Sequence, residues 1–252
     1  MVLNGIDVSQ HQGIVDWSAV ANGGIDFAIL RAGYGGTSDL YFARNAAACQ
    51  SVGLPIGLFW FSYALNPSEA REEAHRLLYA ADGLRIEYPL VFDFEYASVD
   101  YAARHGIYIN KDAASEIAFA FLTEIENAGY FAMNYTNVDY LNRYFTSDLR
   151  NRFGVWLASW SNREEPPTDC YIWQHSNTGK VPGISGNVDL DRAYIDFPSY
   201  LREAGLNHLA PPPDPVITWA VNAGITENEN WDGILTKKEI VEILKRYDER
   251  NK

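Results

Sequence analysis

Short apolar segments recur along most of the chain, and their spacing is the feature that most limits the fold. Each is four to eight residues long and rich in β-branched and aromatic side chains, which predicts strands. They cover residues 5–9, 26–33, 55–61, 89–95, 130–136, 154–159, 171–176 and 187–190. Strands that alternate with helical stretches predict an α/β fold with a mostly parallel sheet, and eight of them favour closure into a barrel.

Helical patterns fill the early intervals between these strands. They cover residues 40–52, 67–81 and 111–128, and Pro67 is a typical start signal for the second. After Tyr135 the intervals shorten and leave little room for full helices. We therefore expect an incomplete ring of helices around the barrel, with the functional residues at the carboxyl ends of the strands.

A proline-rich stretch separates this pattern from the last part of the chain. LAPPPDP at 209–215 is typical of a stiff linker. It divides a predicted barrel domain at 1–208 from a predicted small helical module at 216–252. A module of this size rarely folds alone, which favours docking or self-association.

Charge argues against several classes of partner. The formal net charge of -13 and the lack of clustered Lys and Arg exclude a typical nucleic-acid-binding protein. An anionic surface also gains nothing from anionic lipid, and no apolar stretch is long enough to span a membrane.

The N-terminus and the cysteines bear on the compartment. MVLNGIDVSQHQG has no basic region followed by a long apolar one, so we expect a product made in the cytoplasm without a signal peptide. Cys49 and Cys170 form no CxxC pattern and are expected to be free thiols, and no zinc or other metal site is expected.

Acidic residues stand at the ends of several predicted strands. Asp7 lies near the end of the first, Asp93 and Glu95 end the fourth, and Asp189 falls in the eighth. Alternate strand residues share a face, so the Cα atoms of Asp93 and Glu95 should lie about 6–7 Å apart on one side. Any one acid can cap a turn or anchor a loop, but four at one rim favour a functional cleft. His11, close after Asp7, is expected to be an exposed loop residue.

Polar and aromatic residues share these strand ends. Tyr135 ends the fifth strand, Trp160 follows the sixth, and Gln174 ends the seventh together with His175. Tyr63, Tyr135 and Trp160 are candidates for stacking against a sugar ring, and ordinary packing explains each about equally well. Gln174 is a further candidate for substrate binding.

The pair of neighbouring acids suits one chemistry in particular. Cleavage of a glycosidic bond needs a protonated acid for the leaving oxygen and an anionic group that favours the oxocarbenium-like transition state. Partial burial and a nearby negative charge would raise the pKa of Glu95 and make it the general acid, while hydrogen bonds keep Asp93 ionised. Metal sites and structural networks use the same acid-x-acid pattern, so the pair alone leaves these alternatives open.

Five segments follow a pattern that occurs together in a known enzyme family. They are GIDVSQHQGIVDW (5–17), PLVFDFE (89–95), YTN (135–137), VWLASW (155–160) and IWQHSNTGKVPGISGNVDLDRAY (172–194). Over roughly residues 3–200 the chain resembles the family 25 glycoside hydrolases, which are N-acetylmuramidases of the lysozyme and phage endolysin type. The opening and closing segments are the most specific.

The resemblance implies a flattened, irregular (β/α) barrel that cleaves the β-1,4 bond between N-acetylmuramic acid and N-acetylglucosamine in bacterial peptidoglycan, without a cofactor. It implies that Glu95 is the acid, that Asp93 is its carboxylate partner, and that Asp7 and Asp189 flank the cleft. The family is usually described as retaining, and the attack by the substrate's own N-acetyl group stays open as one route. The turn RAGYG at 31–35 and His175 depart from the family pattern, and these departures concern the substrate subsites and not the reaction.

The main hypothesis is a phage endolysin that acts on the cell wall after release by a separate membrane-permeabilising protein. An inactive peptidoglycan-binding protein is the alternative, although a pure binder gains nothing from four mutually repelling acids. A chitin-directed hydrolase is disfavoured because the DxxDxDxE signature is missing.

Two hypotheses concern the tail module. Residues 228–239, NENWDGILTKKE, match the spacing of an EF-hand calcium loop, but Asn228 stands where Asp is expected. Wall targeting or self-association, which would make a homo-oligomer, is the favoured role for 216–252.

Overall fold

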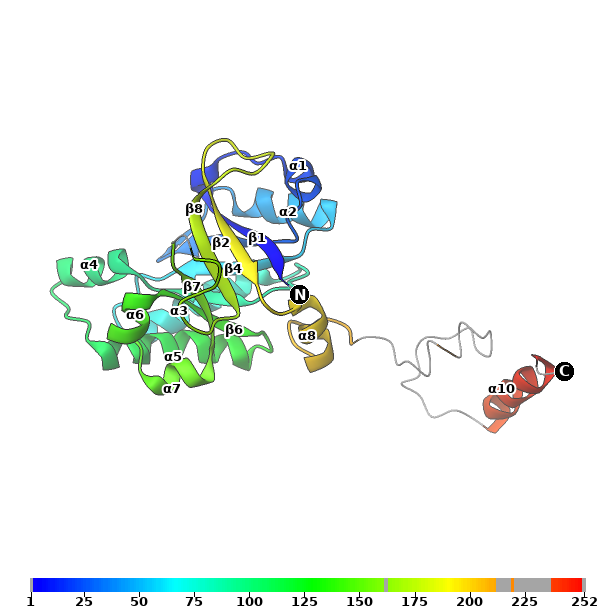
Figure 1. Cartoon of the computed structure of the whole chain (residues 1–252). Coiled ribbons are helices and arrows are strands. Elements are labelled where there is room, and N and C mark those ends of the chain that lie inside the picture. The colour runs from blue at the N-terminus through cyan, green and yellow to red at the C-terminus, as the bar shows by residue number, and fades with distance from the viewer. Residues whose placement is uncertain (1, 161–162, 212–218, 220–236, 251–252) are drawn as a thin grey trace. The chain divides into compact units, whose positions relative to one another are not determined.

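The computed structural model describes residues 2–160, 163–211, 219 and 237–250. The chain divides into two compact units, Met1–Leu209 and Ala210–Lys252, which are described separately. The first carries all the strands among the described residues and is shown with its helices in Figure 1.

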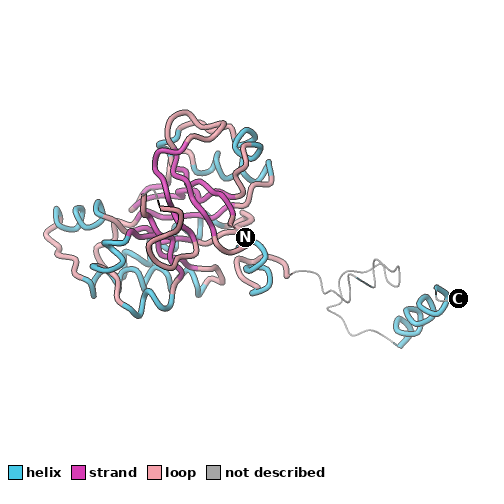
Figure 2. The backbone as a smooth tube through the Cα atoms, viewed as in Figure 1, coloured by secondary structure: helices cyan, strands magenta, loops and turns pink. Residues whose placement is uncertain are grey.

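The strands of the first unit close into a barrel (Figure 2). Their order is β1-β9-β8-β7-β6-β5-β4-β2, and β1 pairs with β2 to complete the ring, while the two-residue β3 extends β2 as a hairpin. The bounds are β1 Leu3–Val8, β2 Phe27–Tyr34, β3 Thr37–Ser38, β4 Ile56–Phe61, β5 Leu90–Asp93, β6 Ala132–Asn137, β7 Gly154–Ala158, β8 Ile172–Gly179 and β9 Val188–Ala193. The predicted eight-stranded barrel is confirmed, and only the short β3 was not anticipated.

The direction of the last strand differs from that of the others. All neighbouring pairs from β1 through β2, β4, β5, β6 and β7 to β8 are parallel, whereas β9 runs antiparallel to both β8 and β1. A short connection from Lys180 to Asn187 allows this, because an antiparallel neighbour needs no helical crossover. The start of β9 therefore lies at the rim formed by the carboxyl ends of the other strands.

Helices surround the barrel unevenly. Their bounds are α1 Trp17–Asn22, α2 Phe42–Val52, α3 Pro67–Ala81, α4 Tyr96–Arg104, α5 Lys111–Asn127, α6 Val138–Arg143, α7 Ser147–Arg152 and α8 Phe197–Ala204. The predicted helix at 67–81 is observed, with Asn66 capping its first amides, and the other two differ from their predicted bounds by one or two residues. The two helices between β6 and β7, α6 and α7, are each six residues long, as the shortened intervals indicated.

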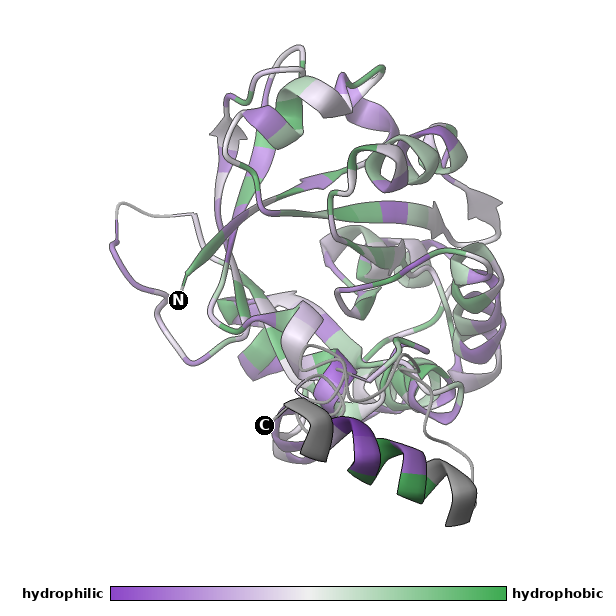
Figure 3. Ribbon diagram, turned by 90° about the vertical axis from the view of Figure 1, so that its right-hand side faces the viewer, coloured by the Kyte–Doolittle hydropathy of each residue, from purple (hydrophilic) through white to green (hydrophobic). Residues whose placement is uncertain are grey.

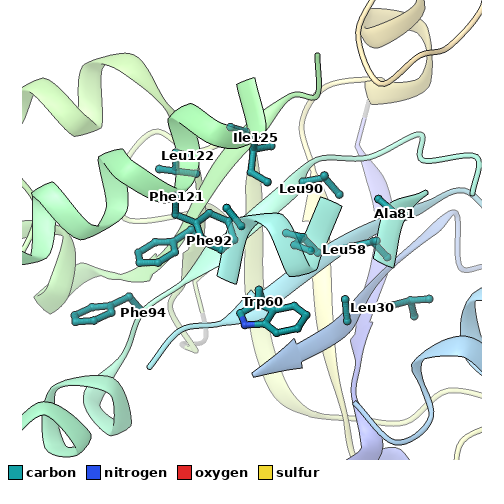
Figure 4. Packing of buried hydrophobic residues seen from close by; sticks show 14 of the residues in the cluster. Leu30, Leu58, Trp60, Ala81, Leu90, Phe92, Phe94, Phe121, Leu122 and Ile125 are labelled. Atoms are coloured by element: carbon teal, nitrogen blue, oxygen red, sulfur yellow. The ribbon is translucent and has the colours of Figure 1, made fainter. Parts of the chain in front are cut away.

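Alternation along each strand creates two apolar layers. Leu58 and Trp60 of β4 and Leu90 and Phe92 of β5 point outward and pack against the helices, and Figure 4 shows Phe92 beside Phe121 of α5. The intervening residues point into the barrel. The inner layer contains Phe27, Ile29, Phe59, Val91, Met133, Trp156 and Ile172.

One end of the barrel interior is plugged by aromatic rings. Phe27 and Tyr88 stack with ring centroids 4.2 Å apart, and Phe197 of α8 lies 5.1 Å from Tyr88. Gly5 is required beside them because a Cβ there would lie 2.2 Å from the Phe27 ring. Because Phe27 begins β2 and Tyr88 precedes β5, this is the amino end of the strands, and the opposite end is the one available for a site.

The second unit contains α10, Lys237–Arg250. Hydrophobic and hydrophilic residues alternate along it (Figure 3), and Ile240, Val241 and Leu244 are exposed. Most of the predicted linker at 209–215 and of the calcium-like loop at 228–239 lies outside the described residues. In the part of the chain that is described, no helix is both long and apolar enough to cross a membrane.

Candidate active site

A cavity of about 190 Å³ opens at the carboxyl end of the barrel strands. It is lined by Asp7, Ser9, His11, Gln12, Arg31, Phe59, Phe61, Asp93, Glu95, Tyr135, Trp156, Gln174 and Asp189. All four acids predicted from the sequence are therefore brought together, along with Tyr135 and Gln174. His11 is exposed, as expected, yet it also contributes to the wall.

Three of these acids lie in the cavity because they stand at or just after the carboxyl ends of parallel strands. Asp7 and Asp93 stand at the carboxyl ends of β1 and β5, and the chain stays extended through Glu95, with φ -132°, before α4 begins. Phe94 points to the outer layer, so Asp93 and Glu95 share the inner side. The backbone N–H of Glu95 donates to Ser98 Oγ at 3.1 Å, which holds the residue at the start of α4.

Asp189 lies at this rim for a different reason from the one expected, because it is near the start of its strand and not at the end. It is the second residue of β9 and lies directly opposite Asp7 in the antiparallel pairing of β9 with β1. Its place at this rim follows from the reversed direction of β9, since in a parallel strand the second residue would lie at the other end of the barrel.

Burial and neighbouring negative charges raise the pKa values of the acids in the cavity. Burial, and next the charge of Glu95, raise the pKa of Asp93 well above its usual range. Burial also raises the pKa of Glu95, and Asp189 adds to this, while the Tyr135 hydroxyl opposes it. Burial raises the pKa of Asp189 to about 6.

Hydrogen bonds were expected to keep Asp93 ionised, but the structure shows a different support for its charge. Its Oδ1 accepts no hydrogen bond from the described residues, and Arg31 is the group that favours its charged form. Arg31 is itself held by Asp39, with Nε 2.9 Å from Oδ2. A buried carboxyl with an oxygen that accepts no hydrogen bond prefers to share a proton, so the Asp93 and Glu95 pair is suited to holding one proton between two acids.

A hydrogen-bonded chain crosses the cavity from Asp7 to Tyr135. Gln174 Nε2 donates to Asp7 Oδ2 at 2.7 Å, and Gln174 Oε1 accepts from the Tyr135 hydroxyl at 2.9 Å. Trp160 Nε1 donates to the same Oε1 at 2.9 Å. An indole N–H is only a donor, so this contact fixes the orientation of the Gln174 amide.

Two predicted stacking residues lie outside the cavity. Trp160 is 56% exposed and reaches the site through Gln174. Tyr63 follows β4 and packs with its ring centroid 5.2 Å from Phe61, which does line the cavity. His175 lies beside Trp173, with ring centroids 5.5 Å apart.

Several residues near the site were missed from the sequence. Arg31 and Trp156 line the cavity, and Asp191 lies just beneath it with 1% exposure. Alternation gives the signal for two of them: Arg31 shares the inner side with Ile29, and Asp191 stands two residues after Asp189, the same spacing as Asp93 and Glu95.

Among the described residues, no group of three or more His, Cys, Asp or Glu side chains is arranged to hold a metal ion. Cys49 is buried and Cys170 half-buried, and both are free. Burial raises the pKa of the Cys170 thiol to about 12, so it is a poor nucleophile.

The closed barrel and its acid-lined cavity define a glycoside hydrolase type of site, with paired carboxyl groups where the strands end. The family model for glycosyl hydrolases family 25 matches residues 6–184, and the chain belongs to this family. The matched segment includes Asp7, Asp93 and Glu95, whereas Asp189 and Asp191 lie just beyond it.

Individual relatives are similar over most of the barrel. An autolytic lysozyme of Clostridium acetobutylicum is 25% identical over 191 residues, which is 75% of this chain and 55% of the relative. The modular autolysin LytC of Streptococcus pneumoniae, solved with a synthetic peptidoglycan ligand, has a TM-score of 0.68 and 24% identity, covering 77% of this chain and 47% of LytC. The CTP1L endolysin has a TM-score of 0.64 and 22% identity, covering 79% and 69%. The chain thus spans about half the length of the two autolytic relatives.

Proposed function

We propose that this protein is a peptidoglycan hydrolase that cleaves the β-1,4 bond between N-acetylmuramic acid and N-acetylglucosamine. The observation that carries the proposal is the placement of Asp93 and Glu95 in one cavity at the strand ends of a family 25 barrel. The lysozyme among its relatives and the peptidoglycan ligand bound by LytC support this choice of substrate.

In this proposal Glu95 donates its proton to the leaving glycosidic oxygen as the bond from that oxygen to the anomeric carbon breaks. Glu95 is the half-buried member of the pair and stands at the cavity wall, whereas Asp93 is 4% exposed. With the proton of the pair on Glu95, Asp93 is ionised and stabilises the positive charge that develops on the sugar ring. The substrate's own N-acetyl oxygen, oriented by Asp93, bonds to the anomeric carbon, so no enzyme nucleophile is needed. Water that gives a proton to Glu95 then attacks the same carbon, breaks this bond and releases the product.

The experiment is digestion of purified peptidoglycan followed by mass spectrometry of the fragments. We expect N-acetylmuramic acid at the new reducing ends. Glu95→Gln keeps the shape of the side chain but removes the transferable proton, and should lower kcat by roughly 10²- to 10⁴-fold. Glu72→Gln, an exposed substitution on α3, is the matched control and should act like the native protein.

A Glu95→Gln variant with native kcat would refute the assignment of the acid. Binding to walls without any cleavage by the native protein would instead favour the inactive peptidoglycan-binding alternative.

The finer proposal is a phage endolysin that is made in the cytoplasm and reaches the wall after release. The likeness to the CTP1L endolysin supports it, and the autolytic relatives are equally similar. Expression inside a susceptible bacterium tests it: lysis should require co-expression of a membrane-permeabilising protein. Lysis without that protein would contradict this role while leaving the hydrolase proposal intact.

A further inference from the structure

Asp191 is a buried acid beneath the cavity with an incomplete set of hydrogen bonds. Its Oδ1 accepts from Trp156 Nε1 at 2.8 Å. Its Oδ2 accepts nothing from the N–H and O–H groups of the described residues. An ionised carboxylate that is 1% exposed and half satisfied is costly, because burial removes the water that would solvate its charge.

Two carboxyl groups, those of Asp189 and Asp7, lie near Asp191. In the antiparallel pairing of β9 with β1, Asp189 lies opposite Asp7 and Asp191 lies opposite Gly5, two positions further along the same inner side. Gly5 has no side chain, so the Asp191 carboxyl lies near the Asp7 carboxyl, close enough for a hydrogen bond between them, and its charge raises the pKa of Asp7. Two carboxyl groups can form such a bond only if one of them carries a proton.

We propose that Asp191 is a positioning residue for the proposed hydrolysis, because its carboxyl shares a proton with Asp7 and holds Asp7 in place to accept from Gln174. The inference rests on the proposed function of the cavity. Gln174 in turn accepts from the Tyr135 hydroxyl, whose oxygen faces Glu95. Asp191 thus acts on the general acid through Asp7, Gln174 and Tyr135.

The surrounding charges favour a retained proton. Asp189 on the same strand, Asp7 on β1 and, further away, Asp93 on β5 are all acidic. The other ionisable groups among the residues that line the cavity are Glu95, Arg31, His11 and Tyr135, and Arg31 is paired with Asp39. Burial first, opposed by the Trp156 hydrogen bond, raises the pKa of Asp191 to about 8. Burial also raises the pKa of Asp7 well above its usual range, so both acids of the pair favour a retained proton.

The first test compares Asp191→Asn with Asp191→Leu. Asparagine has a carbonyl to accept from Trp156 and an amide N–H to donate to Asp7, as the protonated acid does, whereas leucine has neither. We expect Asp191→Leu to lower kcat about 10- to 100-fold, as for loss of a hydrogen bond to a charged group. Asp191→Asn should recover most of that loss. Asp169→Asn, in an exposed loop, is the control.

Equal losses in the asparagine and leucine variants would overturn the proposal, because they would mean that Asp191 acts as a charge. Native kcat in both variants would overturn it as well, because Asp191 would then not position the site.

The second readout does not depend on activity. A carboxyl with a raised pKa binds a proton in the folded protein that the unfolded chain has lost, so stability falls as the pH rises from about 4 towards about 8. Asp191→Asn has no such proton, and its melting temperature should fall less over this range than that of the native protein and of Asp169→Asn. Parallel curves would show that no proton is held at Asp191. If native protein fails to cleave peptidoglycan, this readout still decides the shared proton, so the two proposals can fail separately.

Discussion

Glu73 is a buried carboxyl outside the cavity, and we predict that replacing it with glutamine stabilises the barrel at neutral and higher pH. It lies on the inner side of α3 with 5% exposure. Its Oε1 accepts from the backbone N–H of Tyr63 at 2.9 Å, while its Oε2 has no partner among the described residues. Burial raises the pKa of Glu73 from 4.5 to about 7.

The sign and size of the effect follow from this shift. Between about pH 4.5 and about pH 7 the folded protein keeps a proton on Glu73 that the unfolded chain releases, so the free energy of unfolding falls as the pH rises and then levels off. At 1.36 kcal/mol for each pKa unit, the total is about 3 kcal/mol. Glutamine is neutral throughout and keeps an oxygen for the Tyr63 N–H. Glu73→Gln should therefore match the native protein in acid and exceed its stability by up to about 3 kcal/mol above pH 7.

Urea unfolding followed by tryptophan fluorescence measures this difference at about pH 5 and about pH 8. Glu72→Gln removes an exposed charge from the adjacent position and controls for the change in net charge. A stability difference between Glu73→Gln and native protein that is the same at both pH values would refute the reasoning, because the effect would then not come from the proton.

The remaining predictions concern the site, the plugged end of the barrel and the tail. Asp93→Asn should lower kcat by roughly 10²- to 10³-fold because the anionic group beside the reacting sugar is lost; native release of reducing sugars from peptidoglycan would remove Asp93 from the proposed mechanism. Gly5→Ala should cost about 1–3 kcal/mol of stability, since its Cβ would overlap the Phe27 ring, and a native melting temperature would contradict the close packing there. Deleting residues 210–252 should leave a folded barrel that cuts soluble fragments at near-native rates. The truncated protein should lyse intact cells more slowly, because a second binding site or a second copy of the enzyme raises its local concentration at the wall. Light scattering separates the two tail roles, since only self-association predicts that the deletion turns an oligomer into a monomer. A truncated barrel that is insoluble would show that the tail is part of the core.

Local sequence patterns were enough to predict the strands, the longer helices and the paired acids. The two-residue alternation that puts Asp93 and Glu95 on one side is a property of any extended backbone. The start of α3 follows from Asn66 and Pro67, which act on the first turn of that helix alone. Such features depend on neighbours in the chain, so one sequence contains the information needed.

The tertiary structure decided which of these side chains meet and in what protonation state. The reversed direction of β9 brings Asp189 opposite Asp7 and places Asp191 beneath the cavity, although the spacing of Asp189 and Asp191 was as visible as that of Asp93 and Glu95. The same pairing of strands crowds Asp7 and Asp191 together away from water. Protonation depends on burial and on charges from strands far apart in the sequence, and both exist only once the barrel has closed.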